Sequence, residues 1–561
     1  MSTIIKGDLW SCIKRNKEKL ISFNTQTWLP QQIEDYPGVL VSYLDKDFLS
    51  DSINPWSLYE TPANVATFVV APTGAGKTSM IYHLLIPQAV KVNKKVLYLC
   101  SRSALCAQQK KVAMENEFNG ALKVNGIQVK DMNEYFTEQG LVEQLNFGAI
   151  DIMTYQAFIH NKSLRGNDYA FVVMDESHFV ISDATFNPFT EEILEKIITS
   201  YAYTRRIYLT ATPQECLDEI YSYEQAIIPS LLHCSSYMNV YFMAEDYSYL
   251  HPSFFTHENE IINLIISRPD EYWLIFVREK SYGNELKDKL SLDIPEIITA
   301  DTKDSKIYTE LLSSEKMPAK IIISTKVLDV GINIKTSNLN LVLFEGPDLV
   351  TLKQELGRKR IKEDGFLKVY FHTPDIETLK KRTAKIEDSI VRAKTLIVKS
   401  KNGSFIDSLE PPLYYDGSKI KFNEFHIKKL NFDLWTYKEI IAHMESVDDP
   451  EKQGLLYAKW ILSHFEGLTY DRNKLFLRKP SEEAKKILNS YDDQILCKDE
   501  LHDFSSKLIS ILPDPRKRGR DKPPAICKIN EMINPLGFIV ETISTNPVTY
   551  KIKKSEETVN E

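Results

Sequence analysis

Short apolar runs alternate with longer polar segments between residues 60 and 225. The runs span residues 68–70, 96–100, 150–153, 171–174 and 207–209, and they are rich in β-branched residues. Continuous apolar runs of this length are typical of strands that are buried on both faces, and the segments between them are long enough for helices. This alternation predicts a parallel α/β sheet, which binds its ligands at the carboxyl ends of the strands.

The same alternation returns in the second half of the chain. Apolar runs at residues 273–277, 297–300, 321–324, 339–344 and 366–371 predict a second parallel α/β domain. Beyond residue 375 the apolar positions recur with the period of a helix. The fold class predicted from these patterns is therefore α/β, with two tandem parallel-sheet domains and a mainly helical C-terminal region.

These patterns also divide the chain into smaller units. Residues 1–59 are expected to form an accessory domain or a lead-in that packs on the first sheet. A basic, proline-bracketed segment is expected to be either a solvated linker or a contact for phosphates, and the helix and hairpin after it suggest a small winged module. The predicted units are 1–59, 60–225, 236–375, 376–512 (helical accessory domain), 513–525 (basic linker) and 526–561.

Composition changes this picture only slightly. The chain has 561 residues, of which 43% are hydrophobic and 26% charged, as in ordinary soluble proteins. No apolar run has the length of a membrane span, no secretory leader is visible, and the seven cysteines form no C-x-x-C pair. We expect a cytoplasmic or nucleoid-associated protein that contacts no membrane. The net charge of −8 argues against a nonspecific polycation, although a local basic field can still bind nucleic acid.

The segment 71–78 carries the clearest chemistry. It reads APTGAGKT, and it connects an apolar run to a helical stretch, which is the arrangement of a phosphate-binding loop. Backbone N–H groups of such a loop surround phosphate oxygens, the lysine pairs with the β- and γ-phosphates, and the threonine hydroxyl binds Mg²⁺. The predicted cofactors are ATP and Mg²⁺, and the predicted nucleotide-binding residues here are Pro72, Thr73, Gly74, Ala75, Gly76, Lys77 and Thr78.

Two further strand ends carry polar residues. The run 171–174 leads into Asp175 and Glu176, which we expect to hold Mg²⁺ and to activate water as a general base, respectively. His178 follows two positions later, where it can be either an ordinary packed or solvated histidine or a sensor of the γ-phosphate. The run 207–209 leads into Thr210 and Thr212, whose hydroxyls can hydrogen-bond to His178 or to the acidic pair.

APTGAGKT, MDESH and LTATP, in this order, resemble motifs I, II and III of superfamily 2 helicases and translocases of the DExH type. The resemblance implies two RecA-like domains and a nucleic-acid-dependent ATPase. It covers about residues 60–375, and LTATP looks more like the DNA translocases than the RNA helicases.

The resemblance extends to four further segments. Segments 101–105 and 153–156 resemble motifs that touch the nucleic-acid backbone, and 323–333 and 354–360 resemble motifs V and VI. It implies nucleic-acid contacts by Ser101, Arg102, Thr154, Ser324 and Thr325, and nucleotide contacts by Gly331 and Asn333. For the segment that resembles motif VI, the resemblance implies catalytic roles for Gln354, Arg358 and Arg360. One of the two arginines is expected to act as an arginine finger, and the sequence leaves open which one.

Together these features predict an ATP-driven helicase or translocase that acts on nucleic acid, with DNA expected in preference to RNA. Two alternatives stay open. One is a translocase that moves on duplex DNA without unwinding it, as a subunit of a restriction, defence or replication complex with protein partners. The other is a nucleic-acid clamp or scaffold that ATP closes.

Overall fold

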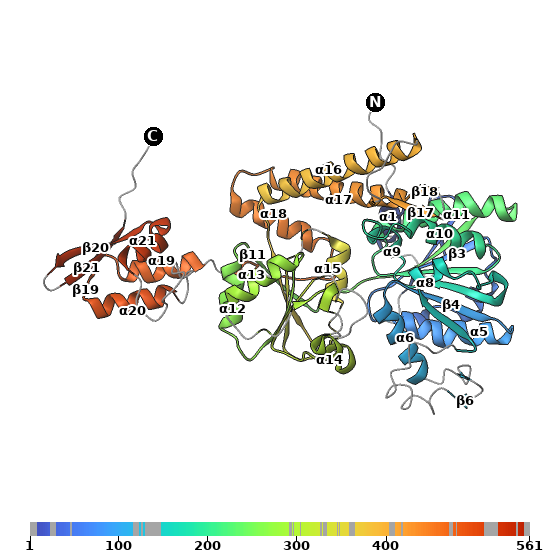
Figure 1. Cartoon of the computed structure of the whole chain (residues 1–561), viewed down its shortest axis with the longest axis horizontal. Coiled ribbons are helices and arrows are strands. Elements are labelled where there is room, and N and C mark those ends of the chain that lie inside the picture. Colours follow the sequence, from blue (N-terminus) through green and yellow to red (C-terminus); the bar gives the residue numbers. More distant parts are fainter. Residues whose placement is uncertain are drawn as a thin grey trace.

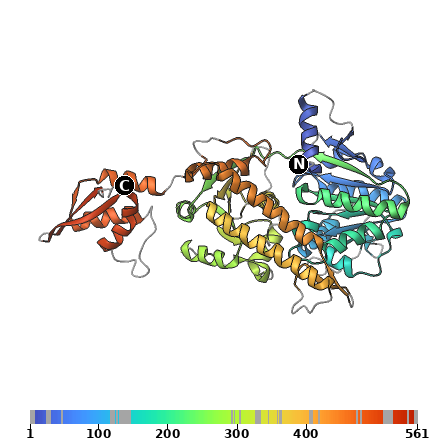
Figure 2. The same cartoon turned by 90° about the horizontal axis from the view of Figure 1, so that it is seen from above.

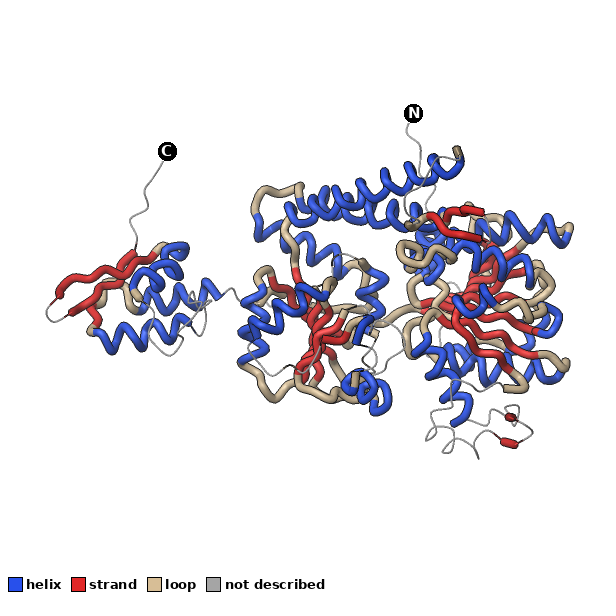
Figure 3. The backbone as a smooth tube through the Cα atoms, in the orientation of Figure 1, coloured by secondary structure: helices blue, strands red, loops and turns tan. Residues whose placement is uncertain are grey.

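The computed structural model contains two parallel sheets, each between layers of helices, and a small separate module at the C-terminal end (Figures 1 and 3). It describes residues 8–22, 30–44, 48–115, 123–124, 127–128, 147–290, 294, 297–302, 305–325, 328, 334–344, 346, 348–357, 359, 365–402, 410–416, 419–470, 475–477, 480–509, 525–545 and 548–554.

The first lobe is built on an eight-stranded sheet of order β1-β2-β10-β3-β9-β8-β4-β7, parallel except for β1. Its strands are β1 (Gln31–Gln32), β2 (Val39–Leu44), β3 (Val65–Val70), β4 (Lys95–Cys100), β7 (Ile150–Thr154), β8 (Tyr169–Met174), β9 (Arg205–Thr210) and β10 (Tyr237–Met243). Side chains alternate across each strand, so Phe68 and Val70 enter one apolar cluster and Val69 enters the cluster on the other face. The five predicted runs are all strands of this sheet, as expected for residues that are buried on both faces.

Helices cover both faces of this sheet. They are α1 (Leu9–Ser22), α2 (Leu49–Ser52), α3 (Pro55–Glu60), α4 (Lys77–Met80), α5 (Ile86–Lys91), α6 (Ser103–Glu115), α8 (Tyr155–His160), α9 (Phe179–Ser182), α10 (Thr190–Ser200) and α11 (Leu217–Leu232). A π-helical turn, Ile81–Leu85, joins α4 to α5, and a short hairpin, β5 (Lys123–Val124) and β6 (Ile127–Gln128), lies beside the lobe.

The second lobe has a six-stranded, all-parallel sheet of order β11-β16-β15-β12-β14-β13. Its strands are β11 (Leu250–Phe255), β12 (Tyr272–Phe276), β13 (Ile297–Ile298), β14 (Ile321–Ser324), β15 (Leu339–Leu343) and β16 (Leu367–His372), and its helices are α12 (Glu258–Ile266), α13 (Lys280–Leu290), α14 (Lys306–Ser314) and α15 (Leu349–Leu356). The fold class predicted from the sequence, two tandem parallel-sheet lobes with a mainly helical C-terminal region, is confirmed.

Two boundaries differ from the predicted ones. β10 begins at Tyr237, inside the range 236–375 that we assigned to the second lobe, yet it pairs with β2 and β3 of the first sheet. β2 lies in the segment 1–59 and is an integral strand of the same sheet rather than part of a separate accessory domain. These parallel pairings join residues far apart in the chain, and no local pattern reveals them.

A long helix pair bridges the two lobes. α16 (Ile376–Lys401) and α17 (Glu424–Met444) run side by side above both sheets, as Figures 1 and 2 show, and the hairpin of β17 (Leu413–Asp416) and β18 (Lys419–Phe422) connects them over the first lobe. Phe425, near the start of α17, lies in the core of the first lobe, whereas Tyr437, Ile440 and Met444 lie in the core of the second. α18 (Pro450–Leu462) then packs on the second lobe.

The C-terminal module has its own core. It consists of α19 (Pro480–Ser490), β19 (Ile495–Leu496), α20 (Lys498–Ile509), α21 (Ile526–Ile533), β20 (Phe538–Thr545) and β21 (Val548–Lys554), with antiparallel strand order β19-β21-β20. Most of the basic linker, residues 513–524, lies outside the described residues. Within the part of the chain that the structure describes, no helix is both long and apolar enough to cross a membrane.

Candidate active site

The phosphate-binding loop joins β3 to α4. Gly74 and Gly76 have φ values of +99° and +80°, in the left-handed region that favours glycine, and Gly76 is the N-cap of α4. Ala71 and Ala75 are buried and anchor the loop in the core. The Lys77 ammonium donates to the carbonyl oxygen of Ala71 at 3.1 Å, which holds it inside the loop.

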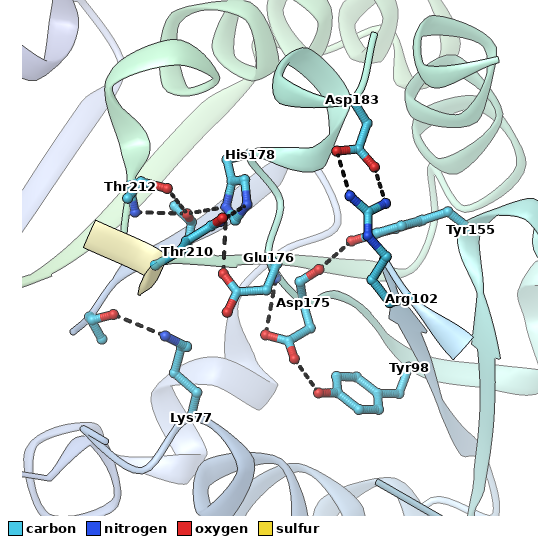
Figure 4. A network of polar contacts seen from close by, with 12 residues as sticks. Lys77, Tyr98, Arg102, Tyr155, Asp175, Glu176, His178, Asp183, Thr210 and Thr212 are labelled. Atoms are coloured by element: carbon cyan, nitrogen blue, oxygen red, sulfur yellow. Dashed lines mark hydrogen bonds and ion pairs between the residues drawn. The ribbon is translucent and has the colours of Figure 1, made fainter. Parts of the chain in front are cut away.

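The acidic pair follows β8. The Tyr98 hydroxyl donates to Oδ2 of Asp175, and the Glu176 N–H donates to Oδ1 at 3.0 Å (Figure 4). The Tyr155 hydroxyl donates to the Asp175 carbonyl oxygen at 2.7 Å. Burial, and next the charge of Glu176, raises the pKa of Asp175 to about 6, whereas Lys77 lowers it. The Asp175 carboxylate is therefore held by two donors beside a cation.

Glu176 has an unusual backbone conformation. Its φ is +51°, in the left-handed region that costs a residue with a Cβ about 1–2 kcal/mol. The turn is fixed by backbone hydrogen bonds that tie its neighbours to adjacent strands, with Asp175 N–H donating to Leu99 at 3.0 Å and Ser177 N–H to Leu209 at 2.8 Å. In this conformation the Glu176 carboxylate lies 3.5 Å from Nδ1 of His178.

His178 connects this pair to the end of β9. Its Nδ1 lies 3.1 Å from the Thr210 hydroxyl, which in turn accepts from the Thr212 N–H at 2.9 Å. Burial lowers the pKa of His178, which favours the neutral ring with one donor and one acceptor nitrogen. The predicted contact between His178 and Thr210 is present.

The second lobe reaches the same cluster through α15. The Gln354 side-chain amide nitrogen lies 2.5 Å from Nε2 of His178. When this amide donates to Nε2, Nδ1 carries the ring proton and faces Thr210 and Glu176. Gly357 lies against Thr73 of the phosphate-binding loop, where an added Cβ would stand 2.8 Å from the Thr73 hydroxyl. The two lobes therefore meet at the nucleotide side of the site.

Several residues predicted to contact nucleic acid also have contacts within the protein. Ser101 and Ser324 are buried, and the Ser324 hydroxyl donates to a backbone carbonyl at 2.8 Å. Arg102 forms a two-pronged ion pair with Asp183. The sequence could not show these partners, because a serine or an arginine after a strand can turn inward or outward.

Thr154 and Thr325 have structural contacts. The Thr154 hydroxyl accepts from the Ala157 N–H at 3.1 Å and caps α8, and the Thr325 N–H donates to the Ile298 carbonyl oxygen at 3.0 Å. Four predicted site residues lie outside the described residues, namely Gly331, Asn333, Arg358 and Arg360.

Sequence reasoning missed the aromatic and accessory residues of the site. Tyr98 and Tyr155, which orient Asp175, look like ordinary core residues of their segments. Gln109, on α6, donates to the Thr78 hydroxyl at 3.3 Å. A cavity of about 1420 Å³ lies between the lobes and α17, and it is lined by His178 and Gln354 as well as by residues of α16, α17 and α18.

The donor set near Lys77 suits a hard divalent cation. The Thr78 hydroxyl and the Asp175 carboxylate are oxygen donors, which Mg²⁺ prefers, and Mg²⁺ in nucleotide sites keeps waters and phosphate oxygens as its other ligands. Among the described residues, no group of three or more His, Cys, Asp or Glu side chains is arranged to hold a metal ion.

Comparison with known proteins gives a match over the first lobe. Residues 56–220 match the family described as DEAD/DEAH box helicase. No curated protein matches the chain. Solved structures similar to it include S. cerevisiae Dbp5 bound to RNA and ADP BeF3, with 16% identity and a TM-score of 0.40 over 55% of this chain and 79% of that one.

Two other similar structures are a DEAD box protein from the hyperthermophile Methanococcus jannaschii and Mss116p bound to ssRNA and AMP-PNP. The first is 17% identical, with a TM-score of 0.31 over 58% of this chain and 86% of that one. The second is 12% identical, with a TM-score of 0.42 over 84% and 92%. Over residues 56–220 the chain is similar to the DEAD/DEAH box helicases, which are nucleic-acid-dependent ATPases.

Proposed function

We propose that this protein is an ATP-driven helicase or translocase, that its track is DNA, and that closure of the two lobes is coupled to hydrolysis. One observation carries the proposal: Gln354 of the second lobe meets His178 of the first at 2.5 Å, and His178 lies 3.5 Å from Glu176. Any change in the distance between the lobes therefore changes the surroundings of the candidate base.

In this proposal each residue of the cluster has a chemical role. Lys77 binds the β- and γ-phosphates, and Glu176 takes a proton from the attacking water. Asp175 and Thr78 would hold Mg²⁺, which when bound would supply positive charge next to the phosphates. His178, Thr210 and Thr212 form the polar connection between the base and the second lobe.

The arginine finger is expected directly after α15. Gly357 is the residue before Arg358, and its contact with Thr73 brings this part of the second lobe to the phosphate-binding loop. Either Arg358 or Arg360 would then stabilise charge on the transferred phosphoryl group when the lobes close.

The choice of DNA rests on LTATP at residues 209–213, which resembles the corresponding motif of DNA translocases. The division of the chain into a two-lobed motor, a helical accessory domain and a C-terminal module belongs to the same proposal. The test below separates this proposal from two alternatives. One is a subunit of a larger complex that moves on duplex DNA without unwinding it, and the other is a clamp that ATP closes.

ATP hydrolysis and strand displacement test the proposal together. The purified full chain is assayed with single-stranded DNA, duplex DNA and RNA of equal length, and with a partial duplex that has a single-stranded tail. We expect the strongest stimulation by single-stranded DNA and displacement of the paired strand. Stimulation by duplex DNA without displacement would support the duplex translocase, preference for RNA would overturn the choice of DNA, and binding in ATP without stimulated hydrolysis would support the clamp.

A further inference from the structure

Two buried side chains from outside the predicted motifs contact the candidate Mg²⁺ ligands. The Tyr98 hydroxyl donates to the Asp175 carboxylate, and the Gln109 amide nitrogen donates to the Thr78 hydroxyl at 3.3 Å. Tyr98 is fully buried, and Gln109 is 5% exposed. Each of the two candidate ligands is therefore held by a side chain that reaches it from within the protein.

Tyr98 reaches Asp175 along one face of the sheet. β4 and β8 run parallel, Tyr98 lies opposite Val173, and both side chains belong to the same apolar cluster. Asp175 follows two residues after Val173, and in a strand this spacing returns the side chain to the same face. The phenol ring extends toward the end of β8, so that its hydroxyl meets the carboxylate there (Figure 4).

Gln109 is tied to the helical segment that follows the phosphate-binding loop. Its side chain contacts Thr78 on α4, and its backbone carbonyl oxygen accepts from the Tyr82 hydroxyl, one turn after Thr78, at 2.9 Å. The amide oxygen Oε1 of Gln109 is buried and has no hydrogen-bond partner among the described residues. Because an unpartnered buried oxygen costs free energy, the stability of the core alone does not explain a glutamine at this position.

Both contacts leave oxygen lone pairs for a cation. A hydroxyl oxygen has two lone pairs, and the Thr78 oxygen uses one of them to accept from Gln109. A carboxylate has about four acceptor positions, and Asp175 uses one for Tyr98 and one for the Glu176 N–H. The two donors thus restrict how the ligands can turn. Loss of such a partner behind a metal ligand typically lowers metal affinity about 10- to 100-fold.

We propose that Tyr98 and Gln109 are positioning residues that set the affinity of this site for Mg²⁺. The inference rests on the proposed function, in which Asp175 and Thr78 would hold the cation, and it adds two residues that no motif of the first lobe contains. Tyr98 fixes the carboxylate from β4, and Gln109 fixes the hydroxyl from α6.

The chain offers a matched control for each of these residues. The Tyr155 hydroxyl also donates to Asp175, but to its backbone carbonyl oxygen, and the Tyr82 hydroxyl donates to the backbone carbonyl oxygen of Gln109. Both tyrosines are fully buried, as Tyr98 is. Tyr155→Phe and Tyr82→Phe therefore remove a buried hydroxyl beside the same two residues and keep the hydrogen bonds to the carboxylate and to the Thr78 hydroxyl.

The binding of mant-ADP, a fluorescent ADP, with and without Mg²⁺ tests the proposal. One titration gives the dissociation constant of mant-ADP from the full chain in EDTA, and a second gives the Mg²⁺ concentration at half saturation at a fixed mant-ADP concentration. We expect Tyr98→Phe and Gln109→Met to raise this Mg²⁺ concentration about tenfold or more and to leave the dissociation constant in EDTA unchanged. In Tyr155→Phe and Tyr82→Phe both quantities should equal those of wild type.

Thermal unfolding without nucleotide separates positioning from packing. Gln109→Met removes a buried amide with an unpartnered oxygen, so its melting temperature should equal or exceed that of wild type, although Mg²⁺ binds more weakly. An unchanged Mg²⁺ dependence in Tyr98→Phe or Gln109→Met would overturn the role of that residue, and equal losses in the control variants would overturn the proposal.

The wild-type protein shows separately whether the proposed function itself holds. If wild type binds no mant-ADP, the nucleotide site of the proposed function fails. If it binds mant-ADP equally well in Mg²⁺ and in EDTA, the magnesium ligands of the proposed function fail. In either case the roles of Tyr98 and Gln109 fail with them.

Discussion

Lys429 is the residue whose removal should weaken the bridge between the lobes most. Its ammonium lies 2.9 Å from Glu215, in the 3₁₀ turn that follows Thr212, and 2.7 Å from Asp433, and its side chain is only 7% exposed. Although burial lowers the pKa of Lys429, nearby carboxylates, Glu215 first, raise it well above its ordinary range. Lys429→Met therefore leaves a buried carboxylate without its cation.

Breaking a buried pair by removing one partner costs about 3–5 kcal/mol. The loss is local to α17 and the turn at Glu215, so hydrogen exchange read by mass spectrometry is the suitable assay. Amides in the first half of α17 should exchange at least about 100-fold faster in Lys429→Met, because each 1.4 kcal/mol is a factor of ten. Lys428→Met is the matched control: its pair with Glu219 is 38% and 23% exposed, and such pairs contribute about 1 kcal/mol or less.

The raised pKa of Glu215 makes the predicted loss of stability in Lys429→Met depend on pH. Burial raises the pKa of Glu215 to about 7, against an ordinary 4.5, while Lys429 lowers it. A raised carboxyl pKa means that the folded state binds more protons than the unfolded state, so stability falls as pH rises through this window. Without Lys429 the pKa rises further, and the loss should be larger at pH 8 than at pH 6.

The double variant Lys429→Met with Glu215→Gln should recover most of the loss, because it buries no unpaired charge. Equal exchange in Lys429→Met and Lys428→Met, or a double variant as unstable as Lys429→Met alone, would refute the reasoning.

Three glycines give further predictions. Gly357→Ala places a Cβ 2.8 Å from the Thr73 hydroxyl, so we expect slower ATP hydrolysis by several-fold and a higher KM for ATP; unaltered kinetics would show that the lobes do not approach here during turnover. Gly166→Ala places a Cβ 2.4 Å from the backbone oxygen of Ser200, and should lower the free energy of unfolding by about 1–3 kcal/mol. Gly454→Ala, whose Cβ would meet side chains only at 3.6 Å or more within α18, should stabilise the helix slightly; thermal unfolding that ranks these two variants in the opposite order would contradict the packing.

The strands and the chemistry at their ends could be predicted because local patterns determine them. The apolar runs of β3, β8 and β9 became neighbouring central strands. Lys77, Asp175 and Thr210, at or after the ends of these strands, came together at the carboxyl end of the sheet. β11 was missed because Pro252 and polar residues interrupt it, which an edge strand tolerates.

Contacts between distant segments could not be predicted. Glu215 and Lys429 are 214 positions apart, and the sequence around each residue gives no sign that it has a buried partner. The inward direction of Ser324 and the ion pair of Arg102 likewise depend on neighbouring elements. The sequence therefore predicted which residues lie at the nucleotide-binding loop. The position of α17 over the neighbouring cavity depends on contacts between distant segments and was seen only in the structure.

The most direct test of the central claim is the rate of phosphate release from ATP, with and without single-stranded DNA, by wild type, Lys77→Ala and Glu176→Gln. We expect DNA to stimulate wild type, and Glu176→Gln to lose about 10²-fold or more of this rate, as for removal of a general base. Lys77→Ala should also lose the activity, through weaker binding of the phosphates. Undiminished, DNA-stimulated hydrolysis in Glu176→Gln would contradict the assignment of this site.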